Sequence, residues 1–183
     1  MRRLLFAVFT LASAALPAIA QTPAPTTVIL VRHAEKAAAP ADDPPLTAAG
    51  EARARDLVQA VRDAGVAVVI TTQFARTRAT AQPTATTLGI TPTVVPATSA
   101  AHVRDVVAEI QKHAGQTVLV VGHSNTVPAI VEALGAKRPV AICDSQYDDL
   151  YVVTIRGAGT ANTVHARYGA PSPRDSTCAA MMR

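Results

Sequence analysis

The chain has 183 residues, of which 49% are hydrophobic, so it is long enough for one ordinary domain with a sizeable core. It contains three phenylalanines, three tyrosines and no tryptophan, so the core has to be built from Ala, Val, Leu and Ile, which suits packed layers of strands and helices. The formal net charge of +4 is modest, and Arg2 and Arg3 contribute two of these charges, which argues against a nucleic-acid partner.

The first twenty residues have the layout of a secretory signal peptide. A basic start is followed by an apolar segment and by a small-x-small ending at Ala18 and Ala20. We therefore expect residues 1–20 to be removed, leaving residues 21–183 as one exported domain without a membrane anchor. In a Gram-negative source its destination would be the periplasm. An uncleaved anchor is the alternative, but the apolar run is short and a proline interrupts it.

The first predicted strand covers residues 28–31 and leads directly into Arg32 and His33. A short, continuous apolar run is typical of a buried parallel strand, and the residues just beyond its carboxyl end face the ligand crevice in open α/β sheets. We therefore expect both side chains at a ligand site.

Residues 37–46 are predicted to form a loop beside this site, because they contain three prolines and two aspartates. Asp42 and Asp43 are interpreted as solvated loop charges rather than catalytic groups. The helix that follows can be capped by Thr47, and its charged residues, among them Arg53, are placed off its apolar face.

The middle of the chain continues the alternation. A strand over residues 66–71 is followed by Arg76, which lies in a helix predicted over residues 73–88. Pro83 inside that helix predicts a kink or an early break. A short strand at residues 93–95 and an amphipathic helix over residues 101–114 come next.

A second buried strand, residues 118–121, ends at His123. Ser124 or Asn125 can cap the next helix, and the free N–H groups at such a helix start favour an anion. A hairpin made of residues 150–155 and 161–168 completes the chain. Strands that alternate with helices and end in a hairpin predict one α/β domain with a mostly parallel sheet.

Cys143 and Cys178 are the only cysteines. Export makes a disulfide between them chemically permissible, and such a bond would tie the C-terminal segment to the body. Two unpaired thiols are the alternative, because the sequence does not place their β-carbons.

The pattern predicts one pocket that holds two arginines and two histidines. Guanidinium groups present planar forks of donors that match phosphate oxygens, so the pocket suits a dianionic, oxygen-rich group. It suits a metal poorly, since Arg32 would oppose a cation and neither a zinc-type cysteine pattern nor an HExxH helix is present. A neutral imidazole can also attack phosphorus and form a phosphohistidine that water hydrolyses, without any cofactor.

Three motifs at successive strand exits resemble those of the histidine phosphatase superfamily, in its phosphoglycerate mutase-like branch 1, and particularly its small exported phosphatases. The motifs are Arg32-His33-Ala34-Glu35, Arg76-Thr77 followed by Thr80-Ala81, and Gly122-His123-Ser124-Asn125. The similarity extends over about residues 28–168. It implies a three-layer α/β/α sandwich and a metal-free phosphohistidine mechanism.

The same resemblance implies roles for particular residues. His33 would be the nucleophile, and its catalytic partners Arg32, Arg76 and His123 would form the phosphate pocket. Further substrate-binding neighbours are implied at two positions, Asn125 and Glu35.

The chain departs from the family pattern at the proton donor. Many members use a carboxylate downstream of the second arginine, but residues 77–104 contain no Asp or Glu. Glu35, Asp148 or a water are candidates, and a leaving group that needs little protonation, such as that of a phosphoramidate, is another answer. His102 lies in the same region and is interpreted by default as a surface histidine.

These observations predict a phosphoric monoester hydrolase of the histidine acid phosphatase type. It would hydrolyse phosphomonoesters or phosphoramidates, on a small molecule or a phosphoprotein, through a covalent intermediate on His33. A non-catalytic phosphate-binding or sensing protein of the same fold is the first alternative, because the acid is missing. A metal-dependent hydrolase using His33, His123 and loop aspartates is the second. The sequence leaves the oligomeric state open.

Overall fold

The computed structural model describes residues 24–156 and 160–173. The predicted signal peptide, residues 1–20, and Cys178 lie outside the described residues. The helices and strands are, in order, β1 (Thr26–Arg32), α1 (Ala48–Ala60), β2 (Val66–Thr71), α2 (Ala75–Leu88), β3 (Thr93–Val94), α3 (His102–Gln111), β4 (Thr117–Gly122), α4 (Thr126–Ala133), β5 (Asp149–Arg156) and β6 (Thr160–Arg167). None of the described helices combines the length and the apolar character needed to cross a membrane.

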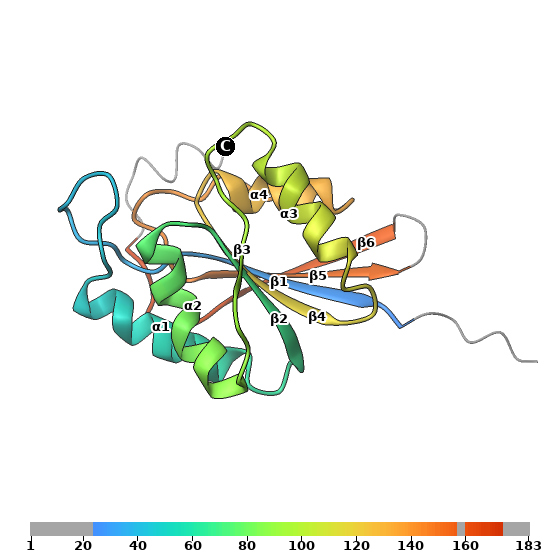
Figure 1. Cartoon of the computed structure of the whole chain (residues 1–183), viewed down its shortest axis with the longest axis horizontal. Helices are drawn as coiled ribbons and strands as arrows, with labels where there is room; N and C mark the ends of the chain where they lie inside the picture. Colours follow the sequence, from blue (N-terminus) through green and yellow to red (C-terminus); the bar gives the residue numbers. More distant parts are fainter. Residues whose placement is uncertain (1–23, 157–159, 174–183) are drawn as a thin grey trace, which may run out of the picture.

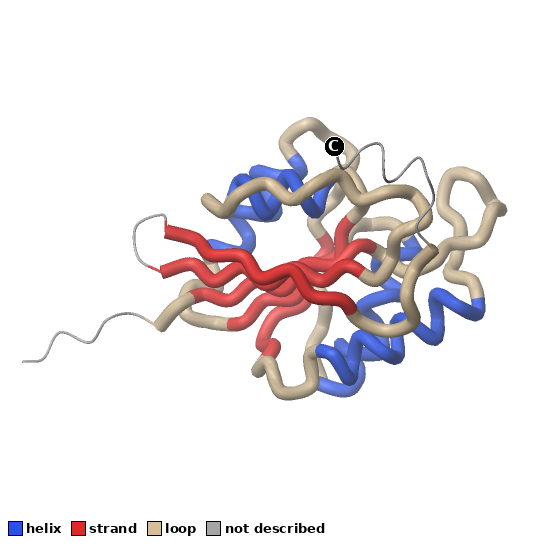
Figure 2. Tube along the Cα trace, turned by 180° about the vertical axis from the view of Figure 1, so that it is seen from behind, coloured by secondary structure: helices blue, strands red, loops and turns tan. Residues whose placement is uncertain are grey.

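The strands form one mixed sheet in the order β3-β2-β4-β1-β5-β6. Strands β1, β2, β3 and β4 pair in parallel, whereas β5 is antiparallel to both β1 and β6. Helices α1 and α2 cover one face of the sheet, and α3 and α4 cover the other (Figure 1). Seen from behind, the strands again lie between the two groups of helices (Figure 2). The predicted three-layer α/β/α sandwich with a C-terminal hairpin is therefore confirmed.

Strand β1 is buried on both faces, which explains its unbroken apolar sequence. Val28 and Leu30 belong to the core beneath α3 and α4, whereas Ile29 and Val31 belong to the core beneath α1 and α2. Alternate residues of a strand point to opposite faces, so a strand covered on both sides needs apolar residues at every position.

The sequence predicted a kink or an early break at Pro83. Helix α2 does not break there, and it begins at Ala75 rather than at residue 73. Ala81 and Ala85, on either side of the proline, are almost completely buried. Packing against the sheet therefore outweighs the local cost of the proline.

Helix α1 fixes the segment that follows β1. The hydroxyl of Thr47 caps the helix by accepting a hydrogen bond from the Gly50 amide at 3.1 Å. The Thr47 amide donates to the carbonyl of Glu35 at 2.9 Å. A Cβ on Gly50 would lie 2.2 Å from that same carbonyl oxygen, so only glycine allows this close approach.

The carboxyl ends of β1, β2 and β4 lie at one edge of the sheet, because these three strands are parallel. Arg32 is paired with Gly122 in the register of β1 and β4, and the His33 amide donates to the Gly122 carbonyl at 2.9 Å. The residues that leave these strands therefore meet at this edge, where open α/β sheets bind ligands.

Candidate functional site

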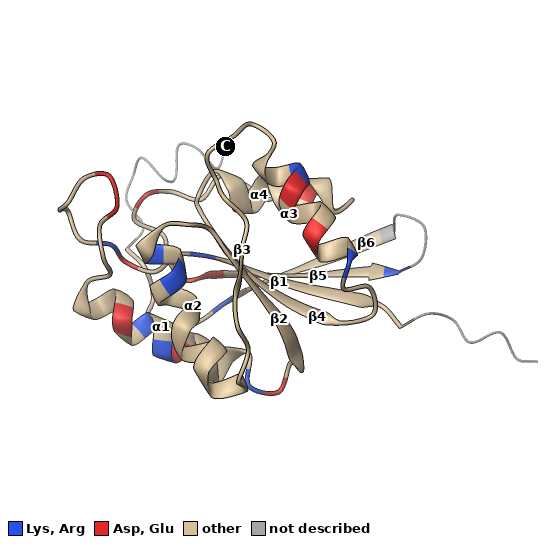
Figure 3. Cartoon of the chain, in the orientation of Figure 1, with Lys and Arg blue, Asp and Glu red and all other residues tan. Residues whose placement is uncertain are grey.

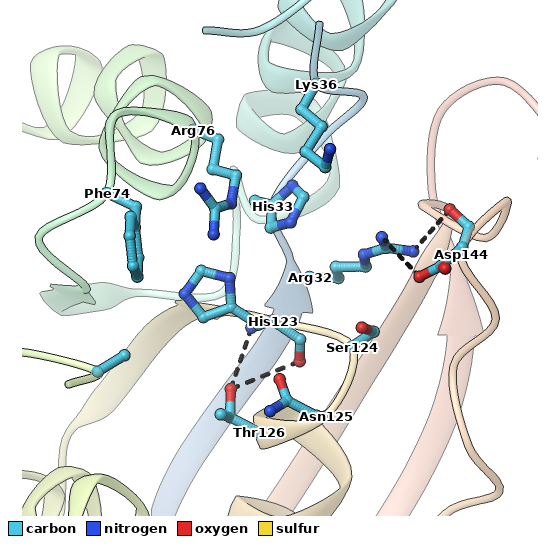
Figure 4. A pocket seen from close by; sticks show the side chains of 11 residues that line it. Arg32, His33, Lys36, Phe74, Arg76, His123, Ser124, Asn125, Thr126 and Asp144 are labelled. Atoms are coloured by element: carbon cyan, nitrogen blue, oxygen red, sulfur yellow. Dashed lines mark hydrogen bonds and ion pairs between the residues drawn. The ribbon is translucent and has the colours of Figure 1, made fainter. Parts of the chain in front are cut away.

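A cavity of about 330 Å³ opens at this edge of the sheet (Figure 4). Its wall is formed by segments that follow β1, β3 and β4, by the start of α2 and by the loop before β5. The lining residues are Arg32, His33, Lys36, Phe74, Arg76, Ala97, His123, Ser124, Asn125, Thr126 and Asp144. Such a volume is at the small end of the range for ligand pockets, so it suits a compact group.

His33 is buried, and one of its ring nitrogens has no hydrogen-bond partner among the described residues. Its Nδ1 lies 2.8 Å from the carbonyl oxygen of Ala34. A carbonyl only accepts, so Nδ1 carries the proton of the neutral ring and the lone pair is on Nε2. Burial, together with the charges of Arg32 and Arg76, lowers the pKa of His33 to about 3, against the opposing effect of the Ala34 hydrogen bond. The ring is therefore neutral at physiological pH, as a nucleophile requires.

His123 lies against His33, with 5.4 Å between the ring centroids. Burial first, and then the charge of Arg76, lowers its pKa to about 4. Its Nε2 is 3.2 Å from the hydroxyl of Thr72, which is itself 2.8 Å from the hydroxyl of Thr77. This buried chain of hydroxyl groups orients the second imidazole.

Arg32 is held by the loop that precedes β5. Its Nη1 donates to three backbone carbonyls, those of Cys143 at 2.7 Å, Asp144 at 3.0 Å and Gln146 at 2.9 Å. The guanidinium carbon lies 4.2 Å from the centre of the Tyr147 ring. Cys143 itself is disulfide-bonded. The position of this arginine is thus set by a segment more than a hundred residues away in the sequence.

Arg76 enters the pocket from the first turn of α2. Its guanidinium carbon lies 4.2 Å from the centre of the Phe74 ring, and its Nη1 lies 3.6 Å from a carboxylate oxygen of Asp43. The Nε atoms of Arg32 and Arg76 are both buried and have no hydrogen-bond partner in the described part of the chain. A buried donor without a partner is costly, and an anionic oxygen would supply one to each arginine.

Five of the six site residues expected from the sequence line the pocket, and Glu35 does not. Its carboxylate accepts hydrogen bonds from Arg53, at 3.0 Å from Nε and 2.7 Å from Nη2. The sequence predicted that Arg53 lies off the apolar face of its helix. This prediction was wrong, because Arg53 is buried and only 4% exposed. A buried guanidinium needs a carboxylate partner, and Glu35 fills that role outside the pocket.

The candidate proton donors lie elsewhere. Asp148 is buried outside the pocket wall and pairs with Arg167 at 2.9 Å. His102 is 4% exposed, so the surface interpretation was wrong; its Nδ1 lies 3.0 Å from the carbonyl oxygen of Pro96, and burial lowers its pKa. Asp144 is the carboxylate in the described pocket wall, and its side chain is fully exposed at the rim.

Sequence reasoning missed several contributors to the site, and four of them carry a charge or an aromatic ring. Lys36 belongs to the same segment as His33, and Phe74 directly precedes the arginine helix, so proximity in sequence gave a signal for both. Asp144 gave none, because it reaches the pocket through the fold. Asp43 was interpreted as a solvated charge, but its carboxylate contacts the first turn of α2.

The described residues include no group of three or more His, Cys, Asp or Glu side chains placed to hold a metal ion. What they bring together is a neutral imidazole with a free nitrogen, a second imidazole and two arginines. This arrangement at the carboxyl edge of an open α/β sheet suits the binding of an anionic, oxygen-rich group such as a phosphoryl group.

Comparison with known proteins agrees with a pocket for a phosphoryl group. The family model described as the histidine phosphatase superfamily (branch 1) matches residues 28–100, which confirms the resemblance of the chain to that superfamily. Residues 28–100 include the first two of the three sequence motifs. No curated protein matches the chain.

Several solved structures with the same fold are phosphatases by name. A proposed phosphohistidine phosphatase, SixA, from Nakamurella multipartitia is 27% identical, with a TM-score of 0.57 over 82% of this chain and 99% of that one. The protein histidine phosphatase SixA complexed with tungstate is 20% identical, with a TM-score of 0.63 over 77% of this chain and 96% of that one. A phosphoserine phosphatase variant from Entamoeba histolytica, in complex with phosphoserine, is 12% identical, with a TM-score of 0.57 over 78% and 96%.

Proposed function

We propose that this chain is a phosphatase that hydrolyses phosphomonoesters or phosphoramidates through a covalent phosphohistidine on His33. The superfamily match and the phosphatases among the solved structures support phosphatase activity. The observation that carries the finer proposal is the His33 ring, whose Nδ1 donates to the Ala34 carbonyl and leaves the Nε2 lone pair free beside two arginines.

The reaction has two steps. Phosphoryl oxygens accept hydrogen bonds from Arg32 and Arg76 while Nε2 of His33 attacks phosphorus. The bond from phosphorus to the leaving group breaks, and the leaving group departs with a proton that it has taken from solvent water. Water then attacks the phosphohistidine, the phosphorus–nitrogen bond breaks, and phosphate is released with the neutral imidazole restored.

The pocket favours substrates whose leaving group needs little help from an acid. Both imidazoles are neutral, with pKa values lowered to about 3 and about 4, so at neutral pH neither is an imidazolium that could donate a proton to the leaving group. Asp144, the pocket-lining carboxylate, is fully exposed and pairs weakly with Arg32 at 3.8 Å. The nitrogen of a phosphoramidate is basic enough to take its proton from solvent before it leaves, so a phosphoramidate suits such a pocket better than an alkyl ester does.

The test is phosphate release by the full chain from phosphohistidine, phosphoramidate and an aryl phosphate, with and without EDTA. We expect activity that survives EDTA and falls roughly 10³-fold or more in His33→Ala. His113→Ala, which changes a histidine outside the pocket, is the matched control and should be unaffected.

Two results would support the alternatives instead. Saturable phosphate binding without release from any substrate would indicate a sensing protein. Loss of activity with EDTA, and its return with a divalent ion, would indicate a metal-dependent hydrolase.

Export belongs to the same proposal. The layout of residues 1–20 supports removal of a signal peptide and release of a periplasmic or secreted enzyme. The N-terminus of the protein recovered from an expressing Gram-negative host should be Gln21, and an N-terminus at Met1 would contradict this expectation.

A further inference from the structure

The loop of residues 37–46 has a fixed base beside the pocket. The Ala37 amide donates to the Pro45 carbonyl at 2.8 Å, and Lys36 forms an isolated antiparallel bridge with Leu46. These contacts hold the two ends of the loop together, so they fix the position of its middle part. That place is the first turn of α2, which the loop reaches through Asp43.

Helix α2 has no cap of its own. Phe74 occupies the N-cap position and makes no side-chain capping bond, and the first turn contains no acidic residue. The carboxylate of Asp43 supplies the missing acceptor, with its two oxygens 2.9 Å and 3.2 Å from the Ala75 amide. An acceptor at a helix N-terminus is normally provided by the preceding residue, and here it comes from a segment 32 positions earlier.

The same carboxylate contacts the next residue, Arg76. One of its oxygens lies 3.6 Å from Nη1 of that arginine, and the Phe74 ring lies beneath the guanidinium group. Figure 4 shows the guanidinium of Arg76 pointing into the space between His33, His123 and Phe74. The arginine that faces the pocket is therefore bounded by an aromatic ring and by a carboxylate.

We propose that Asp43 is a positioning residue for the phosphate pocket. It docks the loop of residues 37–46 on the start of α2 and thereby sets the direction in which Arg76 presents its donors to a phosphoryl group. The inference rests on the proposed function only in taking the ligand of the pocket to be a phosphoryl group.

The two contacts of Asp43 are unequal. A partly exposed ion pair at this distance is weak, and Asp43 is 40% exposed in its side chain. The hydrogen bonds to the Ala75 amide are shorter and carry most of the docking. An asparagine at position 43 keeps an oxygen acceptor, so it should preserve most of the effect, whereas an alanine should not.

The test measures binding of inorganic phosphate to the full chain by calorimetry, at a temperature where circular dichroism shows each variant to be folded. Asp43→Ala should weaken binding about fivefold, the size expected when one positioning contact is lost. Asp43→Asn should stay within about twofold of the original chain. Asp42→Ala is the matched control, since Asp42 is exposed in the same loop, and it should change nothing.

A second background shows whether Asp43 acts through Arg76. Arg76→Lys keeps a cation in the pocket but removes the planar fork, so the effect of Asp43→Ala should shrink to less than about twofold there. An undiminished effect in that background, or binding by Asp43→Ala equal to that of the original chain, would overturn the proposal. Because no turnover is needed, a catalytic failure of His33 would leave this result readable, and the two ideas can fail separately.

Discussion

The two pocket imidazoles are uncharged because they are buried beside arginines. Charging either ring would place another cation in a site that already holds Arg32 and Arg76, and burial removes the water that would solvate it. The cationic arginines and the neutral histidines therefore have different roles in the pocket. The arginines provide charge for an anion, and His33 provides a lone pair.

This division has a signature in the pH dependence of stability. The pKa of His33 is lowered to about 3 by folding, so the unfolded chain binds a proton as the pH falls below about 6.5 while the folded chain does not. The free energy of unfolding should consequently decrease as the pH is lowered from about 6.5 to about 3. At pH 7 the lowered pKa of His33 should have almost no effect on it.

Urea unfolding at pH 7 and pH 5 measures this effect. The original chain should lose about 1–2 kcal/mol more than His33→Asn between the two pH values. His113→Asn, outside the pocket, should behave like the original chain. Equal losses in the original chain and His33→Asn would contradict the lowered pKa.

Arg32 illustrates why a positive charge alone is not enough. Its Nη1 is fully used by three carbonyls, so only the rest of the fork is available to a ligand. In Arg32→Lys a single ammonium group would have to donate to the three carbonyls and to the bound phosphate. The affinity for phosphate should therefore fall about tenfold or more. Calorimetry with phosphate measures this. Arg138→Lys, at an exposed ion pair, is the control, and an equal affinity of the two variants would contradict the expectation.

At the scale of elements, close backbone approach fixes the segment that carries His33. The first turn of α1 packs directly on the backbone of Glu35, and Gly50 is the residue that permits it. At Gly50 the helix and the segment after β1 thus meet backbone against backbone. Figure 3 shows charged residues on helices α1, α2 and α3 and in loops, and none on strands β2 and β4.

Gly50→Ala tests this packing. An alanine would favour the helix by about 1 kcal/mol, but its methyl group would overlap a backbone carbonyl, and overpacking costs about 1–3 kcal/mol. We expect the clash to prevail and the melting temperature to fall by about 2–6 °C. Ala49→Ser, at an exposed neighbouring position, should have little effect. A rise in melting temperature in Gly50→Ala would show that the backbone at Glu35 can move away from the added methyl group at little cost.

At the scale of the whole molecule, Arg53 connects the segment after the first strand to the segment after the last one. Its Nη1 donates to the carbonyl of Tyr168 at 3.0 Å and its Nη2 to that of Ala170 at 2.8 Å, while Glu35 neutralises its charge. One buried guanidinium thereby joins the exit of β1, helix α1 and the segment after β6.

Breaking this connection should be costly. Arg53→Met leaves the Glu35 carboxylate and two carbonyls without their donor, and we expect a loss of about 3–5 kcal/mol in the free energy of unfolding. Arg55→Met, exposed on the same helix, is the matched control. Adding Glu35→Gln to Arg53→Met should recover part of the loss, because the uncompensated charge is then gone. A loss below about 1 kcal/mol in Arg53→Met would show that the connection is dispensable.

The sequence by itself determined the layers and the edge at which the site forms. Residues 28–31 and 118–121 are apolar at every position because strands covered on both faces admit nothing else, and parallel strands necessarily deliver His33 and His123 to the same edge. These properties are local or follow from strand direction, so the periodicity of the sequence contains them.

Only the tertiary structure decided which charges belong to the pocket. Glu35, the last residue of the first histidine motif, is neutralised by Arg53, whereas Asp144 and Asp43 reach the pocket arginines from loops distant from them in the sequence. Pairing of this kind depends on which groups are buried together after folding, because a buried charge takes whatever partner the fold brings near. No spacing along the chain records that choice.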